Sequence, residues 1–224
     1  MDTRDRPDEL KTARTTVKRK ADRGSHDFEV VARIVDEALY CHVGFVVDGQ
    51  PFVVPTGYGR DGRTLYIHGS SASRMLGTLS GGLPVCLTVT LLDGLVLARS
   101  AFHHSINYRS VMVLGAAEEV DGEEKLHGLR VITEHMARCR WDDVRRPTKQ
   151  ELKATTVLKL EITEASAKVR EGFSIHDGED LALPHWAGVI PFVLVPGRPL
   201  PEPRLRPEIP LPTYLADYRR PQGP

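Results

Sequence analysis

The sequence is poor in cysteine, and none of its three cysteines stands close to another. Cys41, Cys86 and Cys139 are odd in number, and no CxxC pair occurs. This pattern argues against the disulfide framework of a small secreted domain and against a zinc site built on cysteine pairs. We expect three free, buried thiols in a protein of the reducing cytoplasm.

Long apolar runs and an excess of one charge are also missing. No run approaches the roughly 20 apolar residues of a membrane helix, and the charged N-terminus has no apolar signal-peptide core. The 30 Lys and Arg residues balance the 30 Asp and Glu residues. Such a chain gives no electrostatic reason to bind nucleic acid or an acidic membrane. The sequence therefore predicts a cytoplasmic globular protein without a nucleic-acid or membrane partner.

Familiar catalytic signatures are absent or misleading. Neither the GxSxG of serine hydrolases nor the HExxH of zinc peptidases occurs. Residues 57–62, GYGRDG, match the GxGxxG pattern of dinucleotide-binding folds. That pattern binds pyrophosphate only where it opens a helix, whereas the β-rich run RTLYIHG follows here. We therefore reject a dinucleotide-binding fold.

Most of the chain reads as short β-strands, because apolar and polar residues alternate. Three dipeptides that favour hairpin turns separate the runs: Asp48-Gly49, Asp61-Gly62 and Asp93-Gly94. A run at 155–172 alternates like one bent strand. Short strands with tight turns predict a mainly β fold with peripheral helices, either an antiparallel barrel or a sandwich.

The predicted helices are few. Asp27 is a candidate N-cap for an apolar stripe that ends at Leu39. A second helix covers 121–139 and carries an Asp121/Glu124 capping-box pattern, and a short third helix covers 148–153.

Both ends of the chain differ in composition from its middle. Residues 1–25 are polar with a basic cluster, which predicts either a solvated tail or a basic lip over an anionic ligand. From Val195 onward, nine prolines fall within 30 residues. Proline lacks the backbone N–H of a helix or inner strand, so residues 194–224 form either an extended or disordered tail or an arm over a partner subunit. One folded domain is expected between them, at 26–193.

Residues 65–79, LYIHGSSASRMLGTL, suit a phosphate group. Ser70, Ser71 and Ser73 offer hydroxyl groups, Arg74 offers a cation, and the helical turn that follows offers free amides. An ordinary serine-rich helix cap with a surface arginine is the alternative. His68, at the end of the preceding strand, is either a structural residue, a heme ligand or an acid–base catalyst.

Residues 98–115, ARSAFHHSINYRSVMVLG, contain two adjacent histidines. On one strand His103 and His104 point to opposite faces and cannot share a metal. In a turn they can converge, but no HxH motif or nearby carboxylate cluster supports zinc. We therefore expect no metal site here, and interpret the segment as a ligand-lining loop or a polar hairpin.

Four stretches carry a resemblance to a known family: CHVGFVVDGQPFVVPTGYGRDGRTLYIHGSSASRML, VCLTVTLLDGLVLARSAFHHSINYRSVMVLG, RWDDVRRPTKQELKAT and HWAGVIP. From about Thr15 to Pro191 the chain resembles the pyridoxamine 5′-phosphate oxidase-like family of FMN-binding split barrels. The similarity is greatest to its flavin-nucleotide-binding and nitroimidazole-resistance branch. The resemblance implies an antiparallel six-stranded split β-barrel that forms a homodimer with FMN at the subunit interface.

The resemblance also implies two groups of cofactor-binding residues. The first follows the strand at Val54, the next strand and the phosphate segment: Pro55, Thr56, Tyr66, Ile67, His68, Gly69, Ser70, Ser73 and Arg74. Many relatives carry lysine where this chain has Arg74, which keeps the charge. The second group borders the pocket of the same or the partner subunit, with a tryptophan at its mouth: Ser105, Asn107, Tyr108, Arg109 and Trp186.

The favoured interpretation is an FMN-dependent oxidoreductase of a small molecule, with His68 or His103 as catalytic proton donor. A true pyridoxamine-phosphate oxidase is not expected, because its basic, histidine-bearing C-terminal motif is missing. Two alternatives stay open. One is a heme-binding protein with His68, His103 or His104 as axial ligand, and the other is a non-catalytic flavin carrier or sensor. A deazaflavin also fits the phosphate cleft.

Overall fold

Six antiparallel strands close into a ring in the computed structural model of the chain, which describes residues 9–219. They are β2 (Tyr40–Val47), β3 (Gln50–Asp61), β4 (Thr64–Ser70), β5 (Gly81–Leu97), β6 (Ser105–Val120) and β7 (Thr155–Glu161). Around the ring the order is β6, β7, β4, β3, β2 and β5, and β5 pairs again with β6. The predicted mainly β, six-stranded barrel is confirmed.

The ring opens between β3 and β4, and this split positions the candidate site. The two strands pair near their hairpin, from Tyr58 opposite Ile67 to Asp61 opposite Thr64. Farther from the hairpin, residues 50–57 of β3 pair with β2, whereas β4 follows β7 as far as Ser70. Helix α2 (Arg74–Leu79) follows β4 and sends Leu76 and Leu79 into the barrel core.

Tight turns form at two of the three predicted dipeptides. Asp48 and Gly49 both have positive φ, 50° and 80°, which is the geometry of a two-residue turn whose twist matches the strands. Gly62, with φ 54°, turns the chain between β3 and β4.

The third predicted turn, at Asp93-Gly94, is wrong. Strand β5 runs through it without reversing, and the pairing with β6 only shifts register between Leu92 and Gly94. A β-bulge of this kind bends a strand instead of ending it. A Cβ on Gly94 would meet the Ile190 carbonyl oxygen at 2.7 Å, so the glycine here allows a neighbouring strand to approach.

Three helices pack on the barrel. Helix α1 (Phe28–Glu37) begins at Asp27, whose carboxylate accepts a hydrogen bond from the Val30 amide at 3.1 Å, as predicted. Helix α3 (Gly122–Met136) covers a small second cluster outside the ring, built on Tyr66 and Ile132. Helix α4 (Lys149–Lys153) has a complete capping box.

The capping box predicted for α3 does not form. The Asp121 side chain makes no capping hydrogen bond, and Gly122 beside it has a positive φ of 58°. Glu124 instead pairs with Lys159 of β7 at 3.0 Å. The Glu124 carboxylate, which the local pattern assigned to the helix end, therefore pairs with a residue that is distant in sequence.

The N-terminal segment belongs to the folded body, so the predicted tail at 1–25 is wrong for its described part, residues 9–25. Leu10 is 1% exposed and lies in the barrel core. Its carbonyl oxygen accepts a hydrogen bond from the Ala165 amide at 3.1 Å. Arg14 pairs with Glu164, so part of the basic cluster serves internal contacts.

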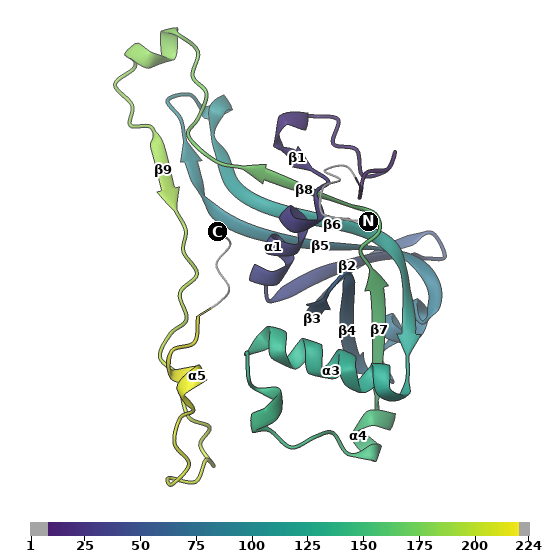
Figure 1. Cartoon of the computed structure of the whole chain (residues 1–224). Helices are drawn as coiled ribbons and strands as arrows, with labels where there is room; N and C mark the ends of the chain where they lie inside the picture. The colour runs from purple at the N-terminus through teal and green to yellow at the C-terminus, as the bar shows by residue number, and fades with distance from the viewer. Residues whose placement is uncertain (1–8, 220–224) are drawn as a thin grey trace, which may run out of the picture.

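Three further strands extend the sheet beyond the ring. Strand β1 (Gly24–Ser25) pairs with β8 (Ala165–Arg170), which follows β7 as a separate strand and pairs with β6. Strand β9 (Gly188–Pro191) pairs with the projecting part of β5. From β9 the chain runs down beside the barrel to the short helix α5 (Thr213–Ala216) (Figure 1). Among the described residues no helix combines the length and apolar character needed to cross a membrane.

Candidate functional site

The split of the barrel brings most of the first predicted group to one region. Pro55 and Thr56 lie on the part of β3 that has left β4, and His68 to Ser70 form the end of β4. Because side chains alternate along a strand, His68 and Ser70 point away from the barrel interior, whereas Ile67 points into it. A Cβ on Gly69 would meet Leu76 Cδ1 at 2.8 Å, so α2 packs directly against this strand end.

In this region, His68 is a polar side chain that lacks a hydrogen bond to any described residue at one of its ring nitrogens. Its Nδ1 is buried and has no hydrogen-bond partner among the described residues. Burial lowers the pKa of the His68 imidazole below its ordinary value, so the ring is neutral near pH 7. A buried polar atom without a partner costs free energy unless something else binds there. The site therefore offers a neutral imidazole to a bound group.

The serines of the phosphate segment make the hydrogen bonds of a helix cap, which is the alternative that the sequence left open. The Ser73 hydroxyl caps α2 by accepting from the Leu76 amide at 3.5 Å, and the Ser70 hydroxyl accepts from the Ala72 amide at 3.2 Å. The Arg74 guanidinium lies over the Phe52 ring, 5.6 Å from its centroid. No carboxylate in the described part of the chain forms an ion pair with Arg74, so its charge is available to an anion.

Two residues of the first group are oriented differently. The Tyr66 side chain is 5% exposed and packs under α3, with its ring edge against His127 at a centroid distance of 5.7 Å. The Ile67 side chain belongs to the barrel core. Contact between these two residues and a cofactor is thus limited to their backbone atoms.

Two of the five residues in the second predicted group line a separate cleft. A cleft of about 820 Å³ lies between the α1–β2 connection, β5, β6, β8 and the start of the C-terminal arm. Asn107 and Arg109 line it, but Ser70, Ser73 and Arg74 do not. Within one protomer the two groups are therefore not joined in this cleft.

Arg109 is held between two carboxylates. Its Nε and Nη2 donate to Asp93 at 3.0 and 2.8 Å, and its Nη1 and Nη2 donate to Glu37. Hydrogen bonds to Asp93 and Glu37 hold the pKa of the Arg109 guanidinium well above its usual range. In this arrangement Arg109 links α1, β5 and β6.

Asn107 is also engaged within the protein. It is 8% exposed, accepts a hydrogen bond from Arg170 and donates one to the Gly172 carbonyl at 3.1 Å. Ser105 is exposed and Tyr108 is half-buried on the same strand. Trp186 is 66% exposed, close to Gly188 at the start of β9.

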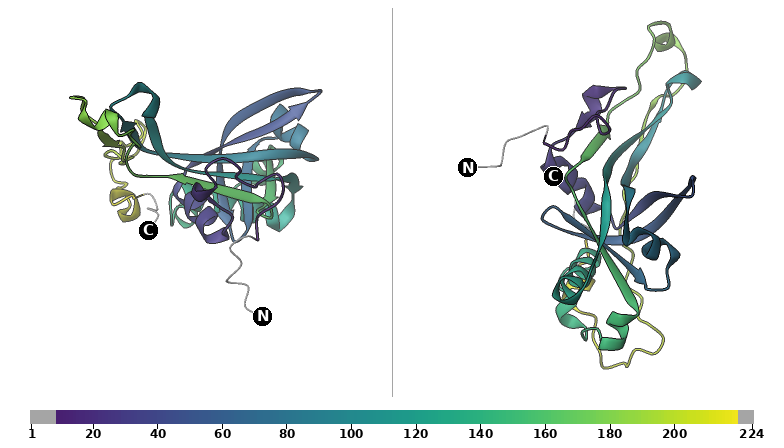
Figure 2. Two further views of the ribbon diagram at one scale, coloured as in Figure 1. Left: turned by 90° about the horizontal axis from the view of Figure 1, so that it is seen from above. Right: turned by 90° about the vertical axis from the view of Figure 1, so that its right-hand side faces the viewer.

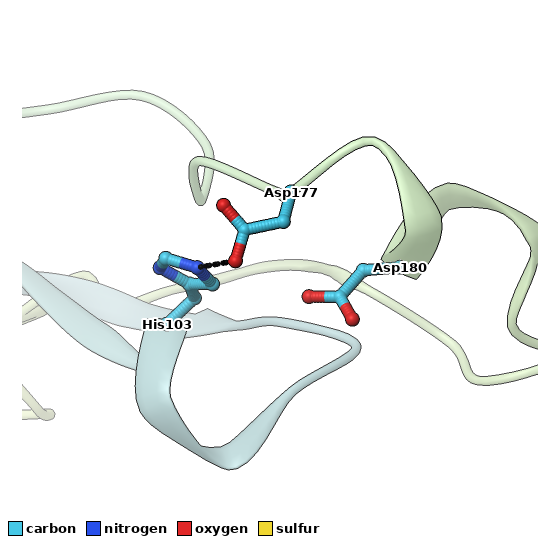
Figure 3. Close-up of side chains that lie close together, drawn as sticks. All are labelled: His103, Asp177 and Asp180. Atoms are coloured by element: carbon cyan, nitrogen blue, oxygen red, sulfur yellow. Dashed lines mark hydrogen bonds and ion pairs between the residues drawn. The ribbon is translucent and has the colours of Figure 1, made fainter.

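The two adjacent histidines diverge. His103 Nε2 lies 3.2 Å from Asp177 Oδ2, whereas His104 Nδ1 lies 2.9 Å from the Ser100 carbonyl oxygen. The prediction that the pair does not share a metal agrees with this geometry. Asp180 lies beside His103 and Asp177, and the ligand atoms of all three are within 4.8 Å of one another (Figure 3). Sequence reasoning missed this cluster, because the aspartates lie more than 70 positions away from the histidine.

The cysteines provide no nucleophile near either group. All three are free, as predicted, but the predicted burial is wrong for two of them: Cys86 is half-buried and Cys139 is exposed. Cys41 is buried in the barrel core, and burial raises the pKa of its thiol to about 12. A thiol with that pKa is not ionised near neutral pH and is unreactive.

Comparison with known proteins identifies the family. The family model described as pyridoxamine 5′-phosphate oxidase matches residues 27–169. The chain belongs to the pyridoxamine 5′-phosphate oxidase family. No functionally curated protein shows a significant sequence match.

Two solved structures are similar to this family member over nearly its whole length. The flavocytochrome Anf3 from Azotobacter vinelandii is 43% identical, with 93% of this chain and 97% of that chain covered and a TM-score of 0.87. The FAD and heme binding protein from Mycobacterium smegmatis is 36% identical, with 86% and 95% covered and a TM-score of 0.83. Membership establishes the split-barrel fold but not the reaction, since one fold hosts many functions.

Proposed function

We propose that this family member is a flavin-nucleotide-binding oxidoreductase of a small molecule. The observation that carries the proposal concerns two residues beside the split of the barrel. Arg74 has no counter-ion among the described residues, and the neutral His68 imidazole has no hydrogen-bond partner among them at Nδ1. The two similar structures, of a flavocytochrome and of an FAD and heme binding protein, support a flavin. FMN and FAD share the phosphate that Arg74 suits.

Six of the nine residues in the first group have a role in this proposal. Arg74, Ser70 and Ser73 bind the flavin phosphate, since guanidinium and hydroxyl groups donate to phosphate oxygens. The backbone of Pro55 and Thr56 borders the ring system, and His68 supplies or accepts a proton at its imidazole. A bound flavin supplies hydride or single-electron transfer, which none of these side chains can provide.

A homodimer with the cofactor at the subunit interface is part of the same proposal. The ring carries an apolar outer face, because four large side chains on β2, β3 and β5 are exposed by 48–67%: Tyr40, Val46, Val53 and Leu92. Pro55 and His42 lie directly opposite each other on this face. A second copy that covers it can bring its Ser105, Asn107, Tyr108, Arg109 and Trp186 region to the flavin of the first.

Spectroscopy tests flavin binding. We expect the purified protein, or the protein mixed with FMN or FAD, to show flavin absorption and to quench free flavin fluorescence. Arg74→Ala should weaken flavin binding by about tenfold or more, since a charge-assisted phosphate contact is lost. Arg33→Ala, at an exposed arginine of α1, is the matched control. A colourless protein that leaves the fluorescence of both flavins unchanged rejects the proposal.

Heme is a second candidate group, alone or together with a flavin. His68 favours it, because Nδ1 of its neutral ring has no partner among the described residues. The two similar structures, of a flavocytochrome and of an FAD and heme binding protein, also favour it. Hemin titration should produce a Soret band that is lost in His68→Ala and kept in His127→Ala. If the band is lost instead in His103→Ala or His104→Ala, one of those histidines is the ligand. If no band appears, the heme candidate is rejected.

A further inference from the structure

The C-terminal arm, residues 192–211, stands off the body of its own protomer although both its ends are fixed there. At one end the Phe192 amide donates to the Asp93 carbonyl at 2.9 Å, next to the β5–β9 pairing. At the other end Tyr214 donates to Asp143 at 2.5 Å, and Tyr218 donates to the Met136 carbonyl at 2.9 Å. Between these anchors the arm extends along one side of the barrel (Figures 1 and 2).

The arm exposes apolar side chains along its whole length. Every residue from 191 to 211 is exposed. Val193, Leu194 and Val195 are 73%, 71% and 71% exposed, and Leu200 is 88% exposed. Consecutive side chains of an extended chain point to opposite sides, so at residues 193–195 neither side of the arm is covered by its own protomer. A surface of this kind marks a contact with another molecule.

The size of the unburied surface agrees with a large interface. The chain exposes 14697 Å². A compact monomer of 24.9 kDa is expected to expose about 10,000 Å², roughly 4,500 Å² less. Obligate homodimer interfaces bury about 2,000–5,000 Å² in total. Each partner of such a dimer covers about half of that total, roughly 1,000–2,500 Å², so the excess on one protomer is more than enough for its side of the interface.

The prolines of the arm restrict its backbone conformation before it makes such a contact. Seven prolines lie between Pro196 and Pro212, and each fixes φ near the extended value. Fewer conformations are then lost when the arm docks, so more of the interaction free energy appears as affinity.

We propose that the arm of each protomer clasps a second copy of this chain and covers the apolar outer face of its barrel. The inference rests on the homodimer of the proposed function, and it adds the element that holds the dimer together. A second copy is the occupant because the chain carries both surfaces, the arm and the exposed face with Val46 and Val53. A two-fold axis pairs each arm with the other protomer's face, so both surfaces are covered at once.

Sedimentation velocity of the full-length, cofactor-loaded protein tests the clasp. We expect the wild type to be a dimer and Val193→Asp/Val195→Asp to raise its dissociation constant by about tenfold or more, because charges enter an apolar contact. Leu126→Asp, at an exposed leucine on α3, is the matched control and should leave the dimer unchanged. If the arm variant dimerises as tightly as the wild type, the inference is overturned while flavin binding stands.

A photo-crosslinking experiment tests the same contact between arm and barrel without introducing a charged side chain. The crosslinker p-benzoylphenylalanine replaces Leu194 in a mixture of ¹⁵N-labelled and unlabelled protein. We expect mixed-isotope adducts that join position 194 to peptides of β2 or β3. Adducts within single molecules only would show that the arm docks on its own body, and would overturn the clasp even if flavin is bound.

Discussion

Arg109 connects three elements through charge. Its side chain is 28% exposed, and its partners Glu37 and Asp93 are 16% and 33% exposed, so water screens these pairs only in part. Arg109→Met removes the cation that the partly buried carboxylates of Asp93 and Glu37 share, and should lower the free energy of unfolding by about 1–3 kcal/mol. Urea denaturation measures the loss. Arg33→Met, at an exposed arginine of α1, should change it by less than about 0.5 kcal/mol.

Lysine at the same position separates charge from geometry. Arg109→Lys keeps the cation but cannot donate to two carboxylates in parallel, so it should restore only part of the stability. Full stability in both Arg109 variants would show that the ion pairs contribute nothing to the fold, and would leave Arg109 free for the cofactor contact predicted from its sequence context.

His68 makes stability depend on pH. Its folded-state pKa lies below the unfolded value of about 6.5, so the unfolded chain binds the proton more readily. The stability that neutral His68 permits is present above about pH 6.5 and declines as the pH falls through the folded pKa. His68→Gln removes this titration. Urea midpoints at about pH 7.5 and about pH 5.5 should therefore differ less in the variant than in the wild type, and equal differences would contradict the assignment.

At the residue scale, sequence can bring together only groups that are close in the chain. The serines and Arg74 lie within five positions of one another, and the structure places them together at the start of α2. Arg109 was assigned to the cofactor by the family resemblance, but Glu37 lies 72 positions away and its contact with Arg109 depends on the fold. No local pattern contains that information.

At the scale of elements, α3 depends on a glycine that allows close packing. A Cβ at Gly128 would meet Tyr66 Cδ1 at 2.8 Å and Val157 Cγ1 at 2.9 Å. Gly128→Ala should push the helix from the sheet and lower the free energy of unfolding by about 1–3 kcal/mol. Gly77→Ala is the control, because nothing lies within 4 Å of its Cβ and alanine favours a helix by about 0.5–1 kcal/mol. Thermal denaturation of both variants measures the difference, and equal midpoints would contradict tight packing at Gly128.

The ends of helices and strands were predictable where a single local sequence pattern determined them. The Asp48-Gly49 turn and the Asp27 cap formed as predicted, because no distant group competes for those atoms. The Asp93-Gly94 dipeptide carries the same turn signal, yet β9 and β6 flank it and the strand continues. Pairing partners distant in sequence override a turn preference worth little free energy, and they are not visible in a local window.

At the scale of the whole molecule, the two ends of the chain differ in how closely they pack on the folded body. The basic N-terminal segment read as a solvated tail, but Leu10 carries it into the core. The proline-rich end was expected as a tail or an arm, and the described residues form an extended arm fixed at both ends. Composition describes how polar a segment is, but it does not show that one apolar residue, Leu10, packs into the core and holds the segment on the barrel.

If the dimer holds the fold together, stability must depend on protein concentration. Unfolding of a dimer releases two chains, so mass action favours the folded state as concentration rises. A 100-fold increase contributes about 2.7 kcal/mol, and for two chains of this length the thermal midpoint should rise by about 2–4 °C. Scanning calorimetry at constant excess of the bound cofactor separates this effect from ligand stabilisation. Val193→Asp/Val195→Asp should show a lower midpoint and a smaller rise, because its subunits part before they unfold, whereas a concentration-independent midpoint in the wild type would mean that each protomer is stable alone.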